Sequence, residues 1–300
     1  MNLKKYINRN LLLVFAVLLG IVFPKFAIDL KPFTFWILAF VMLASLTAIS
    51  NKVLSSFKKL IKPMLIGVVL NHIVFGFFVI IAAYVFSFDI NLFYGFIIIA
   101  ATPPGVAIIP FTAKLNGNIE YSIIATFGAF LASVFLSPLI IKFFSGSSAV
   151  NSFQILKSMV LLILVPFALS RLLLFDKIKP ILIKTRGTFV DIGFSLIIYT
   201  SVGLNSHVFY NDLLLLGELV LAFIFIMFLG GKLLEVILQK KVSKDIIVAN
   251  KLIFTIKSSG FAVVTAIQVF GNEAAVPATV MSVMVLVYLL FQMAYTKVKK

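Results

Sequence analysis

The 300-residue chain has no cysteine, two histidines, one tryptophan and only ten acidic residues. Without cysteine it can form no disulfide, no thiolate metal site and no thiol nucleophile. A nucleophile–base set and a His-x-x-x-His metal motif are both missing, which argues against a membrane enzyme. A repeated filter sequence or a ring of charges, as in ion channels, is missing too. We therefore expect neither enzymatic activity nor a cofactor.

What the chain has in excess is apolar surface. Hydrophobic residues make up 62% of it and charged residues 12%, which is typical of a polytopic membrane protein. The 33 phenylalanines suit lipid-facing and core packing. The net charge of +16 comes from basic residues concentrated between apolar runs, so it indicates orientation in a bilayer rather than binding to nucleic acid.

Ten apolar runs are long enough to cross a membrane. They lie near residues 10–28, 33–49, 64–87, 91–115, 119–144, 153–175, 188–206, 213–239, 245–270 and 274–296. The connections alternate between strongly and weakly basic, which by the positive-inside rule places both termini in the cytoplasm. Lysine greatly outnumbers arginine and no eukaryotic targeting signal stands out, so we expect a bacterial inner membrane.

Two short segments near the amino terminus allow a second interpretation. The first apolar run follows a basic start, as in a signal peptide, but Pro24 and Lys25 come directly after it and no small-residue cleavage site precedes them. We therefore treat it as a retained span. The stretch Asn51–Lys62 is either a basic amphipathic helix on the cytoplasmic surface or a solvated loop.

Two of the ten runs are interrupted. The breaks are Ala100–Gly105, which contains Pro103–Pro104, and Ile256–Gly260. Each begins about twelve residues into its run, and at about 1.5 Å per residue that is about 18 Å deep in a hydrocarbon layer about 30 Å thick. Unwound backbone at this depth persists only where protein or a water-filled cavity covers it. Either break alone is explained by a packing kink, but matched breaks in two halves of a chain point to the binding site of a transporter.

The polar stretch Ser145–Ser152 divides the chain into two halves of five spans. Because five is odd, the second half (149–300) must enter the membrane from the opposite side and is inverted relative to the first half (1–148). The broken spans are the fourth and the ninth, so each is the fourth of its half. The predicted fold is thus an all-α polytopic membrane protein of ten transmembrane helices in two inverted five-helix repeats.

Several stretches resemble a known family. Thr102–Ser122, followed by Thr126 and Ser137–Pro138, is similar to the signature of the bile acid:sodium symporter family, and Leu164–Arg171 and Ser258–Ala262 resemble its sixth-span and ninth-span motifs. This resemblance implies a core domain, from spans 3–5 and 8–10, beside a panel domain, from spans 1, 2, 6 and 7. The two broken helices would cross in the core, with a substrate beside the crossing. Members commonly move organic anions using sodium.

The chain departs from the family pattern where sodium would bind. Ile108–Ile109 stands in place of a Ser-Asn pair, and Ile253 and Lys257 stand in place of a Glu and a Gln. Ser122 and Thr126 are the remaining candidates for an ion site. Sodium is bound by several oxygens and hydrocarbon side chains supply none, so we doubt that both sodium sites exist and predict no metal site.

Lys257 offers a different cation. An ammonium at the membrane centre costs about 2.5–3.5 kcal/mol on insertion scales, so it should face a cavity or a partner. It can brace the crossing by bonding freed carbonyls, as a built-in substitute for sodium, or it can pair with an anionic substrate near the half-helix N-termini. The residues expected at the substrate site and crossing are Thr102, Pro103, Pro104, Gly105, Ile108, Ile109, Thr112, Asn250, Thr255, Lys257, Ser258, Ser259 and Gly260.

Two other pairs of polar residues within apolar runs are informative. Asn71 and His72 fit a hydrogen-bonded packing role better than a ligand role. Lys232 and Glu235 are spaced to pair on one helix face.

The predicted function is secondary transport of a small organic anion by alternating access, with the lipid bilayer as the other partner. The alternative is a cation/proton exchanger on a related inverted-repeat fold, which would need an intramembrane carboxylate near the crossing. Substrate identity, coupling ion and oligomeric state do not follow from the sequence.

Overall fold

The computed structural model describes residues 9–49, 57–86, 89–105, 107–146, 151–174 and 179–298. Every regular element in these ranges is helical. Seven helices are long and apolar enough to cross a membrane, and three shorter apolar helices accompany them. The protein is therefore an all-helical polytopic membrane protein. The first half of the expected surface helix, residues 51–56, lies outside the described residues, and its second half, residues 57–62, is helical. The expected boundary at 148/149 also lies outside the described residues.

The helices are α1 (Arg9–Val22), α2 (Lys25–Leu30), η2 (Lys31–Phe33), α3 (Thr34–Leu46), α4 (Phe57–Val68), η4 (Val69–Val74), α5 (Phe75–Val85), α6 (Ile90–Ala101), α7 (Ile108–Lys114), α8 (Ile119–Ser145), α9 (Ser152–Met159), η5 (Val160–Leu164), α10 (Val165–Leu172), α11 (Lys179–Leu204), α12 (Ser206–Asn211), α13 (Leu213–Phe223), η6 (Ile224–Leu229), α14 (Gly230–Leu238), α15 (Lys244–Thr255), α16 (Ser259–Val269), η7 (Glu273–Ala275) and α17 (Val276–Val298). Of these, η4, η5 and η6 are π-helical turns within longer helices.

The first two spans differ from the expected boundaries. The apolar run near 10–28 ends as a helix at Val22, and Lys25–Leu46 forms the next long segment. Pro24 lies at the N-cap of α2, where its missing N–H leaves no hydrogen bond unmade. The chain therefore turns at Pro24 rather than after residue 28.

Short polar side chains begin several of the helices. Asp89 accepts from the backbone N–H groups of Asn91 and Leu92 at the start of α6, and Asn118 accepts from Tyr121 N–H at the start of α8. Asp and Asn are favoured at N-caps because their side chains satisfy backbone donors that the first helical turn leaves free. These residues separate apolar runs in the sequence and define where the helices start.

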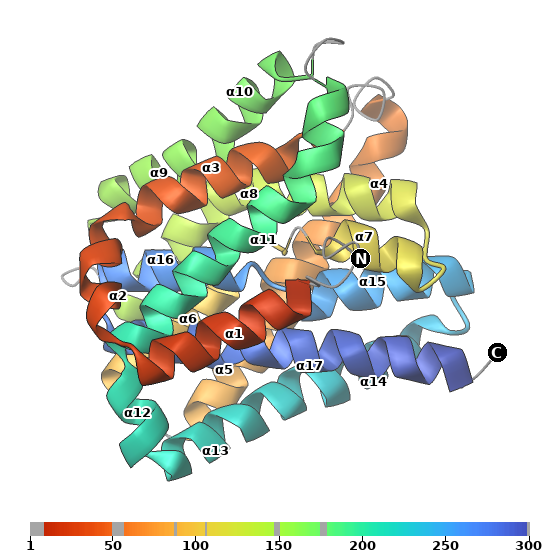
Figure 1. Cartoon of the computed structure of the whole chain (residues 1–300). Coiled ribbons are helices and arrows are strands. Elements are labelled where there is room, and N and C mark those ends of the chain that lie inside the picture. The colour runs from red at the N-terminus through yellow and green to blue at the C-terminus, as the bar shows by residue number, and fades with distance from the viewer. Residues whose placement is uncertain are drawn as a thin grey trace, which may run out of the picture.

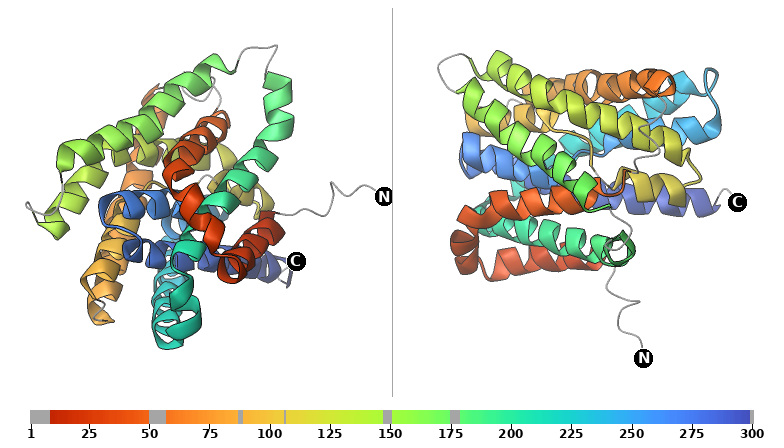
Figure 2. Two further views of the ribbon diagram at one scale, coloured as in Figure 1. Left: turned by 60° about the vertical axis from the view of Figure 1, so that its left-hand side comes forward. Right: turned by 90° about the horizontal axis from the view of Figure 1, so that it is seen from above.

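One group of helices forms one side of the molecule. α1 packs against α11, α11 packs against α3, and α3 packs against α10. A second group contains α4–α8 and α13–α17, in which α4 packs on α8, α5 on α6, and α16 on α17. Figure 1 shows α10 and α13 at opposite edges of the molecule, with α11 crossing between them, and Figure 2 gives two further views of this arrangement.

Arg171 of α10 joins two helices of the first group. Its guanidinium donates to the carbonyl oxygens of Leu46 at 2.6 Å and Ile49 at 2.5 Å, at the end of α3, and it stacks over the Phe167 ring at 4.8 Å. Carbonyls at and just beyond a helix end are short of helical donors, and the charged guanidinium reaches two of them here at once.

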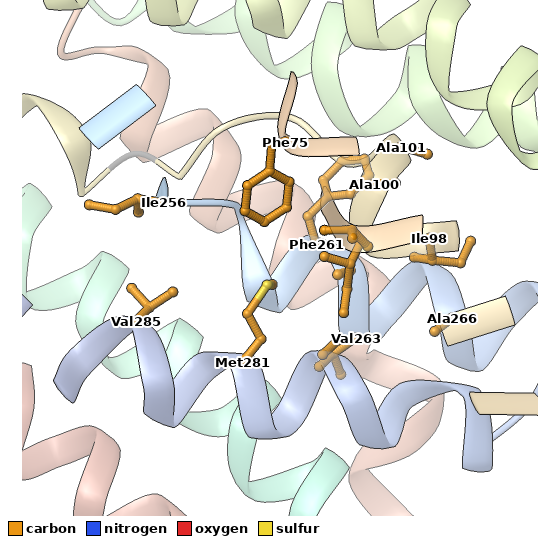
Figure 3. Packing of buried hydrophobic residues seen from close by; sticks show 14 of the residues in the cluster. Phe75, Ile98, Ala100, Ala101, Ile256, Phe261, Val263, Ala266, Met281 and Val285 are labelled. Atoms are coloured by element: carbon orange, nitrogen blue, oxygen red, sulfur yellow. The ribbon is translucent and has the colours of Figure 1, made fainter. Parts of the chain in front are cut away.

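The apolar core surrounds the two predicted interruptions. Ile98 and Ala100 of α6, Ile256, and Phe261 of α16 are at most 1% exposed. In Figure 3, Phe75, Phe261 and Met281 gather from three helices into the space beside the breaks. The breaks are thus enclosed by protein, as unwound backbone in a membrane requires.

Candidate functional site: the crossing of two broken helices

The two breaks lie against each other. The gap between α6 and α7 meets the gap between α15 and α16, and Pro104 and Lys257 form an antiparallel bridge. Gly105 N–H donates to the Ile256 carbonyl at 2.9 Å, and Ser258 N–H donates to the Pro103 carbonyl at 3.0 Å. Backbone groups released by one break therefore satisfy groups released by the other, as they must where water is scarce.

Two consecutive prolines end α6. Pro103–Pro104 has no N–H group, so the carbonyls of Ile99 and Ala100 lack the usual donor four residues later. The Ile99 carbonyl instead accepts from the Thr102 hydroxyl at 2.9 Å. The Ala100 carbonyl accepts from Lys257 Nζ at 3.3 Å. The break is thus imposed by the local sequence, and its carbonyls find partners elsewhere.

Lys257 is the centre of the crossing. Its side chain is only 2% exposed, and Nζ donates to the carbonyl oxygens of Thr102 at 2.5 Å, Asn71 at 3.0 Å and Ala100 at 3.3 Å. The ammonium also lies 5.1 Å from the centroid of the Phe75 ring. Asn71 Nδ2 donates to the same Thr102 carbonyl at 3.1 Å. An ammonium has three N–H donors, so this set of oxygens uses all of them.

A glycine allows the two backbones to approach. A Cβ atom at Gly105 would lie 2.9 Å from both the Lys257 carbonyl oxygen and Ile256 Cγ2. Contacts this short force a shift, and one of the two atoms belongs to backbone that has no room to move. The Pro-Pro-Gly sequence therefore supplies both the break and the close contact.

A second layer of polar side chains supports the first break from α8. The Ser133 hydroxyl donates to the Ala129 carbonyl at 2.7 Å, so the His72 Nε2–H is the donor in its 3.0 Å contact with Ser133 Oγ. The Ser137 hydroxyl donates to the Ala101 carbonyl at 2.6 Å. Ser133 and Ser137 were not among the predicted site residues. Their four-residue spacing, which places both on one face of a helix, is the signal that marks them.

The residues present do not fit a sodium ion at the family's first sodium position. Thr112 and Ser122 bond to each other through their hydroxyl oxygens at 2.9 Å, and Thr112 also donates to the Ile108 carbonyl at 2.8 Å. Thr126 Oγ1 is buried without a hydrogen-bond partner in the described part of the chain. The side chains of Ile108 and Ile253 are fully buried hydrocarbon. Two hydroxyls that already bond to each other do not supply the several oxygen ligands that a sodium ion needs.

Other predicted residues lie near the crossing with different partners. Asn250 accepts from the Tyr121 hydroxyl at 2.8 Å and thereby joins α15 to α8. Thr255 donates to the Lys251 carbonyl one turn earlier in its own helix. Ile109 is half-buried at the start of α7. These three residues surround the crossing and make no hydrogen bond to Lys257 in the described structure.

A small cavity of about 30 Å³ adjoins the crossing on the side of α1, α11 and α17. Gly105, Lys257, Ser258 and Ser259 line it together with apolar side chains. Ser258 is the N-cap of α16 and is 3% exposed, yet its Oγ has no hydrogen-bond partner among the described residues. We call this hollow the crossing cavity.

A larger hollow of about 510 Å³ lies at the other end of α16. Its polar lining comes from the start of α9 and the end of α16: Asn151, Gln154, Lys157, Ser158 and Gln268. Ser259 and Gln268 are nine residues apart, which in a helix is about 14 Å. We call this second hollow the vestibule.

A polytopic helical membrane protein whose two broken helices cross around a buried cation belongs, by its construction, among membrane transporters. The sequence model of the Sodium Bile acid symporter family matches residues 35–212, more than half of the chain, and the protein belongs to this family. Its members are transporters and not enzymes. No curated protein matches the chain.

Proposed function

We propose that this protein is a secondary transporter that moves a small organic anion by alternating access, with Lys257 taking the place of a sodium ion at the crossing. The observation that carries the proposal is the set of three carbonyl oxygens around Lys257 Nζ. Carbonyl oxygens are the ligands that a bound sodium ion would use, and here a covalently attached cation occupies them. Lys257 therefore braces the helices and leaves no N–H for a substrate.

The contacts of the ammonium favour this function over cation/proton exchange. Such an exchanger needs a carboxylate near the crossing, whereas the hydrogen-bond partners of Lys257 are carbonyls. Glu235, an acidic residue within a long apolar helix, pairs with Lys251 at 2.8 Å and with Lys232 at 3.3 Å. The predicted pairing of Lys232 with Glu235 is thereby confirmed.

The helix order supports an architecture of ten spans in two inverted repeats. Each of the ten predicted runs contains an apolar helix. Seven of these helices are long, and three are shorter: Leu11–Val22, Ile90–Ala101 and Ser259–Val269. The π-helical turns η4 and η6 fall in the third span of each half, and the breaks fall in the fourth. The helix group of α1, α3, α10 and α11 corresponds to the proposed panel domain, and the group containing the crossing corresponds to the core domain.

The two hollows suit a route along α16. The crossing cavity lies at the start of this helix and the vestibule at its end. Phe194 of α11 lines the crossing cavity and packs against Gly260, where a Cβ atom would lie 2.6 Å from the ring. A sliding movement of α11 over this glycine would change the width of the crossing cavity, which Phe194 and Ile198 of α11 line.

An anionic head group fits the crossing cavity. The N-terminus of α16 carries partial positive charge, and the Ser258 hydroxyl beside it is buried without a partner. A carboxylate or sulfonate would accept from both. Anions would reach the protein through the vestibule, which has Lys157 and two glutamines in its lining. Following the charge pattern of the connections, we place both termini in the cytoplasm. We place the protein in a bacterial inner membrane because lysine greatly outnumbers arginine and no eukaryotic targeting signal stands out.

The proposal is tested with purified protein in detergent and in liposomes. A thermal-shift panel of monocarboxylates, keto acids and sulfonates should contain compounds that raise the unfolding temperature, because a ligand of the folded form stabilises it. Uptake of the best compound should be scarcely altered when choline replaces sodium, and it should be abolished by Lys257→Ala in protein that remains folded. A steep dependence on sodium, or full uptake by Lys257→Ala, would overturn the proposal.

A further inference from the structure

A third hollow, of about 110 Å³, lies between α1, α11 and α17. Its lining is aliphatic, including Val14, Val17 and Leu18 of α1 and Val283 of α17, and the exception is Ser282. The Ser282 hydroxyl donates to the Ala278 carbonyl at 2.9 Å, so it already has a partner. The side chains that line this hollow, which we call the annex, thus favour hydrocarbon as its occupant.

The annex continues the crossing cavity. Leu13, Ile198, Ser282 and Leu286 line both hollows. Ser282 is the smallest of these four side chains, so it fills the least space between the two hollows. A molecule held at Ser258 in the crossing cavity can therefore extend past Ser282 into the annex.

The annex also opens toward lipid. Val14 is 45% exposed and Leu18 is 54% exposed on the outer face of α1. An occupant longer than the annex would leave between α1 and α17, where the surroundings are the hydrocarbon of the bilayer. An apolar chain can extend into the bilayer hydrocarbon without a free-energy penalty, whereas a charged group there is strongly disfavoured.

We infer that the annex holds the straight hydrocarbon tail of an aliphatic monocarboxylate whose carboxylate lies at Ser258 and the N-terminus of α16. This inference rests on the proposed function and narrows its substrate class. A tail with hydroxyl or charged groups would lose its hydration in the annex without gaining a hydrogen bond. The structure therefore favours an amphiphile with one charged end over compounds that are polar at both ends.

The experiment measures the affinity of the purified full-length protein for straight-chain monocarboxylates of increasing length, from propionate to nonanoate. Each buried methylene contributes about 0.8 kcal/mol, so affinity should rise about fourfold per added carbon. Adipate, which has the length of hexanoate but a second carboxylate, should bind far more weakly than hexanoate. The same series in sodium-free buffer should give the same dependence on length.

Two substitutions fill the annex from different helices, and a third provides the control. Val17→Phe and Val283→Phe should each flatten the dependence on chain length while leaving propionate binding within about twofold. Val22→Phe makes the same chemical change on α1 at a residue that is 58% exposed, and it should leave the full series unchanged. Two independent annex variants guard against one of them failing to fold, and the unfolding temperature of each without ligand identifies such a failure.

The outcomes separate this inference from the proposed function. Measurable binding of short acids with no gain on lengthening would overturn the annex assignment and leave the anion transporter standing. Equal dependence on length in the wild type and in both folded annex variants would also overturn it, because the tail would then lie elsewhere. Failure of every organic anion to bind would overturn both.

Discussion

Replacing Lys257 by methionine removes the ammonium while keeping a stem of similar length beside Phe75. Three hydrogen bonds to the carbonyls of Asn71, Ala100 and Thr102 are lost. The Thr102 carbonyl keeps its bond from Asn71 Nδ2 at 3.1 Å. The carbonyls of Asn71 and Ala100 lose the donor that Lys257 supplied, and they lie where water cannot readily replace it.

The magnitude follows from two opposing effects. Each buried carbonyl left without its donor costs about 1–3 kcal/mol, or about 2–6 kcal/mol for two. Removing the ammonium from the membrane interior returns about 2.5–3.5 kcal/mol. The free energy of unfolding should therefore fall by at most about 3.5 kcal/mol, and Lys257→Met should remain folded in detergent. All of the lost hydrogen bonds are at the crossing, so the loss of free energy destabilises this arrangement in particular.

The transport-competent crossing should therefore become rare. A loss of about 2.8 kcal/mol, in the upper part of the range just given and confined to this arrangement, reduces its population about 100-fold, and uptake into liposomes should fall by a similar factor. Lys232→Met is a matched control, because Lys232 is 58% exposed and a surface ion pair contributes at most about 1 kcal/mol. Wild-type uptake by folded Lys257→Met would refute the reasoning, and so would complete unfolding of this variant with an intact control.

Three further predictions concern neighbouring parts of the structure. The double substitution Ile253→Glu with Lys257→Gln exchanges the attached cation for oxygen ligands. Sodium should therefore raise the unfolding temperature of this variant and leave that of the wild type unchanged. A folded variant whose unfolding temperature does not respond to sodium would contradict the idea that Lys257 replaces the ion. Gly260→Val should reduce uptake at least about tenfold because the valine side chain would collide with Phe194. Adding Phe194→Ala to this variant should restore part of the lost uptake. Additive effects of the two substitutions in this double-mutant cycle would argue against the contact. Arg171→Met should lower the free energy of unfolding, measured by denaturant titration, by about 2–4 kcal/mol because two carbonyls at the end of α3 lose a charged donor. Arg171→Lys should recover little of this loss, since an ammonium lacks the two parallel N–H groups of a guanidinium. An Arg171→Met variant as stable as the wild type would show that these two hydrogen bonds are dispensable.

The positions of the breaks were predictable because their causes are local. Pro103–Pro104 removes two consecutive N–H donors whatever surrounds it, and Gly105 is the residue that tolerates another backbone at contact distance. The low charge content and the length of the apolar runs likewise determine that the chain enters a membrane. Lys257 could also be recognised from the sequence, because an ammonium within an apolar run is unfavourable unless it has a partner or a cavity, however the helices pack.

The role of that ammonium depends on contacts between distant segments. From the sequence, bracing the crossing and binding the substrate were equally good explanations of Lys257. The tertiary structure favours bracing, because it brings the carbonyls of Asn71, Ala100 and Thr102, from a different half of the chain, within reach of all three N–H groups. The supporting serines of α8 and the annex beside Ser282 were likewise beyond the sequence, since helical periodicity shows which residues share a face but not which helix that face meets.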